Sequence, residues 1–194
     1  MSSEKNPTRI RILKAAWEML DSNPGVAARM SDIAKKAGVS RQALYLHFPN
    51  RTELFIETTK YQDEVFGVQD MLVASRTAPD GLARLDAYVE CWGNYIPKIF
   101  GVAKTLIVMK ETDEDADRAW SDRMGDMREG CAAAVAALAR DGALKPNWTE
   151  ETATDFLWVL ISVANWELLT RACGWSQEAY LAQIKATART MLTQ

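Results

Sequence analysis

A single histidine, His47, occurs in the whole sequence, and this scarcity removes several classes of enzyme. A histidine-based catalytic triad would have to use that one residue, and a metal site with two histidine ligands cannot form. The sequence also lacks a P-loop and a GxGxxG fingerprint. We therefore predict a protein that is not an enzyme and that needs neither a metal nor a cofactor.

Cysteine and long apolar stretches are scarce as well. The three cysteines are widely spaced with no CxxC pair, which argues against a disulfide framework and against a zinc knuckle. The longest apolar run, from Phe156 to Ala164, is too short to cross a bilayer. Because the first residues also lack the apolar segment of a signal peptide, we expect a cytoplasmic protein with no membrane partner.

The sequence does contain enough apolar material for a core, and its charge is unevenly distributed. Hydrophobic residues make up 48% of the 194 residues, which suits one large domain or a small domain fused to a medium one. The net charge is −3, yet residues 1–60 hold ten Lys or Arg against six Asp or Glu. A basic end on an acidic body is expected where that end meets phosphate.

The spacing of apolar residues predicts helices throughout and no strands. Clusters of Gly and Pro end several of these helices, and Pro97 is expected to end another. Thr149 with Thr152 opens one helix, and Ser176 starts the last. The clearest of these helices cover residues 31–37, 41–47, 51–73, 113–138, 149–173 and 176–191. The sequence thus indicates an all-α fold of about nine helices.

A helix-turn-helix is indicated near the N-terminus. The small side chain of Ala34 lets two helices cross closely, Gly38 makes the turn, and Leu44 fills the space between the helices. Ser31 is expected to cap the first of these helices and Ser40 the second. The second helix would then present its first polar side chains to a major groove of DNA.

This segment resembles the TetR family of transcriptional regulators. The matching residues are Ile33-Ala34, Ala37-Gly38-Val39-Ser40, Tyr45-Leu46-His47-Phe48, Arg51 and Leu54. The resemblance covers about residues 8–56. It implies a helix-turn-helix DNA-binding domain over residues 1–52 and a helical ligand-binding and dimerisation domain over residues 53–194. Gln42 and Ala43 stand where the family often has Gly followed by Thr or Ser, so the operator sequence does not carry over.

The resemblance also assigns roles to individual side chains. Arg41, Gln42 and Ala43 would face base edges, since arginine suits guanine, glutamine suits adenine and an alanine methyl suits the thymine methyl. Phosphates would be held by Ser31, Ser40, Tyr45, His47 and Arg51. Plainer roles stay open: Arg41 and Gln42 as solvated helix residues, and Tyr45 and His47 as packed ones.

The acidic run Glu111–Asp117 invites a calcium-loop interpretation. Counted from Asp113, however, loop positions 6 and 12 would be Arg118 and Met124, where such a loop needs Gly and Glu. We therefore expect a solvated acidic helix start, which the helix dipole favours.

The apolar run Phe156–Ala164 predicts a helix that is buried on every side. One side would face the core of its own chain and the other a second subunit. Together with the last helix, it would form a four-helix interface across a two-fold axis, which is how TetR-like proteins dimerise. The alternative is the central core helix of a monomer.

Large, adaptable side chains in the middle helices predict a pocket for an apolar or aromatic effector. The candidate lining residues are Trp92, Tyr95, Met109, Trp120, Met124, Met127 and Trp158. Ordinary core packing is the alternative for each of them.

These features together imply a homodimeric regulator of transcription that binds palindromic, double-stranded operator DNA. In the family's usual mode it would be a repressor, released when a small molecule binds the C-terminal body. The helix that begins at Arg51 would link the two regions. The alternative is a helical small-molecule binding or interaction protein without a DNA function.

Overall fold

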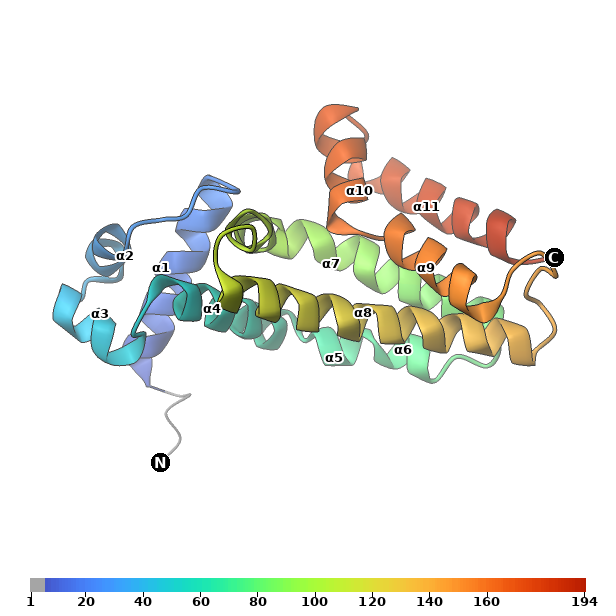
Figure 1. Ribbon diagram of the computed structural model, residues 1–194, viewed down its shortest axis with the longest axis horizontal. Helices are drawn as coiled ribbons and strands as arrows, with labels where there is room; N and C mark the ends of the chain where they lie inside the picture. Colours follow the sequence, from blue (N-terminus) through green and yellow to red (C-terminus); the bar gives the residue numbers. More distant parts are fainter. Residues whose placement is uncertain (1–5) are drawn as a thin grey trace. The chain divides into compact units, whose positions relative to one another are not determined.

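A computed structural model describes residues 6–194, and apart from one isolated bridge these residues form helices, turns and loops (Figure 1). The elements are α1 (Pro7–Ser22), α2 (Met30–Ala37), α3 (Arg41–His47), α4 (Arg51–Phe66), α5 (Val68–Met71), α6 (Val73–Arg76), α7 (Gly81–Met109), α8 (Glu114–Arg140), α9 (Glu150–Leu160), α10 (Val163–Glu167), the π-helical η2 (Leu168–Ala172) and α11 (Gln177–Leu192). Counting α5 and α6 with α4, and η2 with α10, the described chain has the expected nine helical stretches. The prediction of an all-α fold is confirmed.

The chain divides into two compact units. Among the described residues, the first holds those up to Phe66 together with Ile99–Asp122, and the second holds Gly67–Lys98 and Arg123–Gln194. Both α7 and α8 therefore contribute to both units. These units are defined by which residues pack together and not by what they do. The functional boundary expected after residue 52 therefore stays a prediction. None of the helices in the described part of the chain has the length and hydropathy that a membrane span requires.

The helix expected over residues 51–73 is interrupted. α4 ends at Phe66, and Gly67 adopts a left-handed conformation with a φ of 60°. The short helices α5 and α6 follow. Because glycine adopts positive φ without a steric penalty, a lone glycine inside a helical pattern is the sequence signal for this break. The predicted continuous helix is therefore wrong beyond Phe66.

Pro97 lies inside α7 and does not end it. Proline lacks the N–H that would bond the carbonyl four residues earlier, which belongs to Gly93. Gln177 supplies a donor instead, since its Nε2 lies 2.7 Å from that carbonyl oxygen. The Oε1 of the same side chain accepts from Trp166 Nε1 at 2.8 Å. The predicted break at Pro97 is wrong because a side chain of α11 replaces the bond that proline cannot make.

The helix expected over residues 149–173 begins as predicted but does not run through. Its capping box is present, with Thr149 Oγ1 accepting from the N–H of Thr152 at 3.1 Å. α9 then ends before Ile161, and Ser162 caps α10 by accepting from the N–H of Asn165 at 3.2 Å. Serine is among the preferred N-cap residues, so Ser162 is the signal for the second start.

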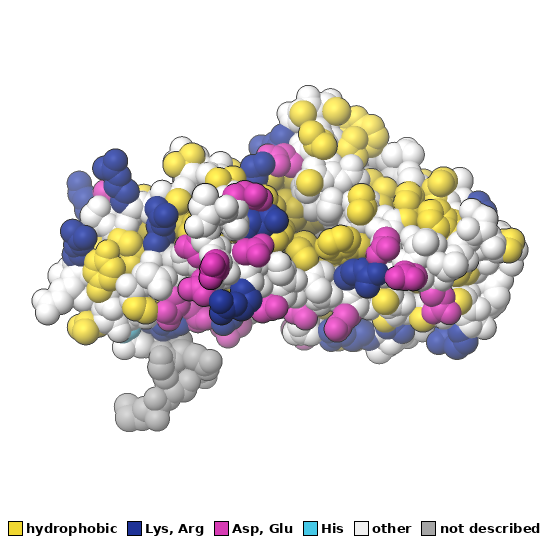
Figure 2. Space-filling view, viewed as in Figure 1, with side chains coloured by type: hydrophobic (Ala, Val, Ile, Leu, Met, Phe, Trp, Pro, Cys, Tyr) yellow, Lys and Arg dark blue, Asp and Glu magenta, His cyan; other side chains and the backbone are white. Residues whose placement is uncertain are grey.

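Within one chain, the apolar run Phe156–Ala164 is buried on one side only. Leu157 and Ile161 are fully buried, whereas Val159 is 60% exposed. Leu168 of η2 is also 60% exposed, and Figure 2 shows hydrophobic side chains on the surface over α10. The core helix of a monomer does not account for this exposed apolar side. That a second chain covers it stays a prediction.

Candidate nucleic-acid interface

The turn between α2 and α3 is built as the sequence predicts. Gly38 is left-handed, with φ 65° and ψ 38°, and its N–H bonds to the last carbonyls of α2. Ser40 caps α3, because its Oγ accepts from the N–H of Ala43 at 3.1 Å. α3 therefore begins at Arg41, immediately after the cap.

α2 begins at Met30, two residues before the start expected with Ser31 as its cap, so Ser31 is not the cap. The N-cap is Arg29, and among the described residues no side chain caps the helix there. Ser31 lies exposed in the first turn of α2. The first N–H groups of a helix without a side-chain cap remain available to an anion. Ser31 therefore does not cap α2, but it still lies beside these groups, where a phosphate contact can form.

α3 buries one side and exposes the other. Leu44 is fully buried and packs into the core of the first unit. The exposed residues of α3 are Arg41, Gln42, Tyr45 and Leu46, with Ala43 and His47 half-buried. Tyr45 is 39% exposed, which does not fit a core aromatic. Leu46 is 81% exposed although the sequence pattern did not single it out.

A basic hollow opens where the start of α2, the start of α4 and one edge of α3 meet. Its lining residues are Arg29, Met30, Ser31, Arg41, Tyr45, Pro49, Asn50, Arg51 and Thr52. None of these residues is acidic, and three of them are arginines. Within the hollow, the Cζ of Arg41 lies 5.6 Å from the ring centroid of Tyr45, a cation–π distance. Such a set of donors suits a phosphate group.

The hollow joins some of the predicted contact residues and adds one that sequence reasoning missed. Ser31, Arg41, Tyr45 and Arg51 come together there, and Arg29 is the addition. Figure 2 shows several Lys and Arg side chains on the surface around α2. The signal for Arg29 is its place immediately before α2, where a cation stands beside a helix start. Predicted residues outside the hollow lining are Ser40, Gln42, Ala43 and His47.

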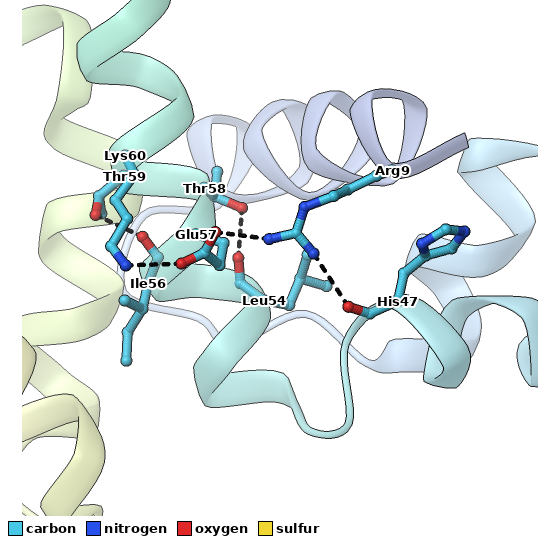
Figure 3. Close-up of polar contacts among 8 residues, drawn as sticks. All are labelled: Arg9, His47, Leu54, Ile56, Glu57, Thr58, Thr59 and Lys60. Carbon is cyan, nitrogen blue, oxygen red and sulfur yellow. Dashed lines mark hydrogen bonds and ion pairs between the residues drawn. The ribbon is translucent and has the colours of Figure 1, made fainter. Parts of the chain in front are cut away.

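Arg9 of α1 fixes the end of α3 (Figure 3). Its Nη1 donates to the carbonyl of His47 at 3.1 Å, and its Nη2 donates to Glu57 Oε2 of α4 at 2.6 Å. Its Cζ lies 4.3 Å from the ring centroid of Phe48. The Arg9 side chain is only 14% exposed, so this contact is shielded from water better than a surface ion pair. One arginine thus holds α1, α3 and α4 together.

The charge of Glu57 depends on its partners. Burial acts to raise the pKa of this carboxyl, but Lys60, with its Nζ 2.8 Å from Glu57 Oε1, and Arg9 together outweigh burial. The pKa of Glu57 is therefore lower than its usual value, and the carboxylate stays ionised opposite Arg9 at neutral pH.

The first turn of α4 is tied to the start of α8. Thr52 Oγ1 donates to Asp113 Oδ2, while Asp113 Oδ1 accepts from the N–H groups of Asp115 and Ala116 at 3.1 Å each. These hydrogen bonds, led by that from Thr52, lower the pKa of Asp113. The acidic run is therefore a helix start, as predicted. Thr52 directly follows Arg51, one of the predicted phosphate contacts.

The end of α7 packs closely against α1 and the turn after it. A Cβ on Gly101 would lie 2.3 Å from Asp21 Oδ1, so only glycine fits there. Thr105 Oγ1 accepts from the N–H of Gly25 at 3.2 Å. Burial raises the pKa of Asp21, whose Oδ2 accepts from Trp17 Nε1 at 2.6 Å. The loop that leads into α2 is thus supported by α7.

The predicted effector-pocket residues are divided between the two units. Met109 and Trp120 belong to the first unit, and Trp92, Tyr95, Met124, Met127 and Trp158 belong to the second. In the second unit, Trp92 and Tyr95 meet edge to face with ring centroids 5.8 Å apart. Arg123 Nη2 lies 3.4 Å from the hydroxyl of Tyr95. Both rings are buried, which fits core packing as well as a pocket, so the pocket stays a prediction.

Known proteins match parts of this sequence. Residues 12–58 match the family model described as bacterial regulatory proteins, tetR family. The nucleoid occlusion factor SlmA of Marinomonas sp. (strain MWYL1) is 41% identical over 64 residues, which cover 33% of this chain and 32% of SlmA. The HTH-type transcriptional activator FasR of Mycolicibacterium smegmatis is 35% identical over 94 residues, covering 47% of this chain and 42% of FasR. The match thus spans less than half of these relatives.

Solved structures share the fold of the whole chain at low identity. A candidate transcriptional regulator from Saccharomonospora viridis, in complex with choline, has a TM-score of 0.83 and 18% identity and covers 100% of both chains. FadR from Bacillus subtilis, in complex with stearoyl-CoA, has a TM-score of 0.76 and 15% identity and covers 94% of this chain and 98% of that chain. At these identities the likeness establishes the fold alone.

Proposed function

We propose that this chain, whose residues 12–58 match the model of the tetR family of bacterial regulatory proteins, is a TetR-type regulator. It binds a palindromic operator through α3 and represses transcription until a small molecule releases it. The observation that carries this proposal is the basic hollow beside the exposed face of α3. Its three arginines, together with the hydroxyl groups of Ser31 and Tyr45, offer donors to a phosphate backbone. The exposed residues of α3 stand next to them, where a major groove would lie.

The contacts follow from this placement. Ser31, Tyr45 and Arg51 hold phosphates at the hollow. The hydroxyl of Ser40 keeps a free donor function after its oxygen has capped α3, and the half-buried ring of His47 stands at the far end of the helix. Both hold phosphates outside the hollow. Gln42 and Ala43 face the bases.

A homodimer supplies the symmetry that a palindrome requires. Val159 and Leu168 of the α9–η2 segment are each 60% exposed, and Met191 of α11 is 43% exposed. A second copy of the chain would cover this surface and place two α3 helices about one turn of DNA apart, roughly 34–36 Å. Apolar surface that one chain leaves open favours such an obligate contact.

The effector binds in the second unit, among the buried rings around Trp92 and Tyr95. Related folds hold chemically different molecules, since the neighbours described above contain choline and stearoyl-CoA. The aromatic and sulfur-containing side chains of this chain favour an apolar or aromatic ligand. To release most of the operator, the ligand must favour the non-binding state by several kcal/mol. The protein would act in the cytoplasm, where it meets DNA.

The decisive experiment is selection of random-sequence duplex DNA with the purified full chain at moderate ionic strength. A palindromic consensus is expected, together with a dimeric mass in solution. A monomeric protein, or one that prefers no duplex over bulk competitor DNA, would instead support a helical small-molecule binding or interaction protein. Compounds that raise Tm and also release the selected duplex would identify the effector class.

A further inference from the structure

The exposed side of α3 has two chemically different edges. Successive residues of an α-helix are rotated by about 100°. Arg41 and Tyr45 therefore lie along one edge of the exposed side, and Leu46 and Ala43 lie along the other. Gln42 stands between the two edges.

The first edge of α3 forms part of the basic hollow. Arg41 and Tyr45 both line it, together with Arg29 and Arg51. The guanidinium of Arg41 rests 5.6 Å from the centre of the Tyr45 ring, which holds its charge on this side of the helix. A cation placed among other cations and hydroxyl groups is suited to the DNA backbone more than to one base.

The second edge is apolar and open. Leu46 is 81% exposed, which exceeds the 64% of Val26, another exposed apolar residue of the same unit. A lone exposed leucine elsewhere on a surface carries little meaning. Leu46, however, follows Gln42 by one helical turn and does not line the hollow. The major groove offers such a side chain one apolar partner, the C5 methyl group of thymine.

We propose that Leu46 is a specificity-determining residue that contacts a thymine methyl group in the operator, while Arg41 contacts the phosphate backbone. This assignment rests on the proposed DNA-binding function and sharpens it. It adds a base contact that the sequence pattern did not indicate, and it moves Arg41 from the bases to the backbone.

A uracil scan of the selected operator tests the proposal. Replacing thymine by uracil, one position at a time, removes only the C5 methyl group. For the unchanged protein, one uracil position in each half-site should weaken binding about fourfold through loss of the Leu46 contact, by the usual contribution of one buried methyl group. Leu46→Ala should bind the thymine and uracil duplexes equally at that position, and Leu46→Met should keep part of the difference.

Val26→Ala is the matched control, because it removes an exposed apolar side chain of the same unit away from α3. It should show the same uracil scan as the unchanged protein. Arg41→Ala should weaken every duplex alike and reduce the dependence of affinity on salt. Circular dichroism and Tm confirm that each variant is folded.

Two results would overturn the proposal while leaving the DNA-binding function intact. One is a Leu46→Ala protein that keeps every uracil effect of the unchanged protein. The other is an Arg41→Ala protein that loses its preference at one base pair and keeps its salt dependence. If the unchanged protein selects no duplex at all, the proposed function fails and this assignment fails with it.

Discussion

Gln177 donates from its Nε2 to the carbonyl oxygen of Gly93, 2.7 Å away, and so satisfies the group that Pro97 leaves without its helical partner. The donor lies 84 positions along the chain from its acceptor. α7 therefore continues through a proline because α11 completes its hydrogen bonding. Trp166 is held by the same amide, which ties α10 to this point as well.

We expect Gln177→Leu to lower the free energy of unfolding by about 1–3 kcal/mol, because it leaves the buried carbonyl of Gly93 without a donor. Denaturation in urea measures the change. Gln183→Leu, an exposed position of the same helix, should have little effect. Adding Pro97→Ala to Gln177→Leu restores a backbone donor and should recover much of the loss. Failure of this rescue would show that Gln177 acts through other contacts.

Arg9→Ala should destabilise the first unit by about 2 kcal/mol, since it removes charge-assisted hydrogen bonds to His47 and Glu57. Operator affinity should fall with it, because the end of α3 loses its support. Thermal unfolding and a DNA titration measure the two effects. Lys14→Ala removes an exposed cation of the same helix and serves as the control. Equal loss in both variants would mean that overall charge, and not the contact, matters.

Stability should fall in acid, and Glu57 should account for part of the fall. The pKa of Glu57 is lower in the folded chain than in the unfolded chain. Its contribution to the free energy of unfolding is therefore complete above the pKa of a glutamate in the unfolded chain, about 4.3. It is lost as the pH falls through the lower folded-state pKa. Glu57→Gln should therefore be less stable than the unchanged protein at pH 7, with a smaller difference near pH 3. A difference that grows in acid would contradict this account.

Gly101→Ala should destabilise by about 1–3 kcal/mol, because the new Cβ collides with both the carboxylate and the backbone of Asp21. Gly125→Ala is the matched comparison. It lies in α8 with nothing within 4 Å of the added Cβ, so alanine should stabilise the helix by about 0.5–1 kcal/mol. Urea denaturation should show a lower free energy of unfolding for Gly101→Ala and a higher one for Gly125→Ala. Destabilisation by both would point to a general need for glycine in these helices.

The three cysteines should differ in reactivity. Burial raises the pKa of Cys91 to about 11 and that of Cys131 to about 12, so both stay protonated and covered at pH 8. Cys173 is exposed. Iodoacetamide should therefore label one thiol in the folded chain and three after denaturation, as counted by mass spectrometry. Labelling of two or more thiols in the folded protein would indicate local opening around α7 and α8.

Features set by neighbouring residues were predictable from the sequence. Gly38 makes the turn and Ser40 caps α3 because each acts on backbone groups within a few positions. Gly67 and Ser162 carried similar local signals for the breaks in two expected helices, but apolar spacing outweighed them in the prediction. Helix ends of this kind can therefore be predicted from nearby residues, if single Gly and Ser residues are treated as signals for a break.

The contacts that support the site were not predictable in this way. Arg9 reaches His47 and Glu57 across 38 and 48 positions, and its role emerges only when α1, α3 and α4 are folded together. Arg29 and Leu46 were missed for a related reason. Their significance depends on which side of α2 and α3 faces outward, and a motif match does not state this.

The hydrogen bond from Thr52 to Asp113 also bears on how the proposed effector would release DNA. α4 ends at Phe66, before the left-handed Gly67, so it does not run as one helix from Arg51 into the second unit. Asp113 instead caps α8, a continuous helix that extends into the second unit. If α8 turned about its own axis, Asp113 would move and pull on Thr52, and the neighbouring Arg51 would shift away from its proposed phosphate contact. Movement of Arg51 by this route would not require α4 to bend.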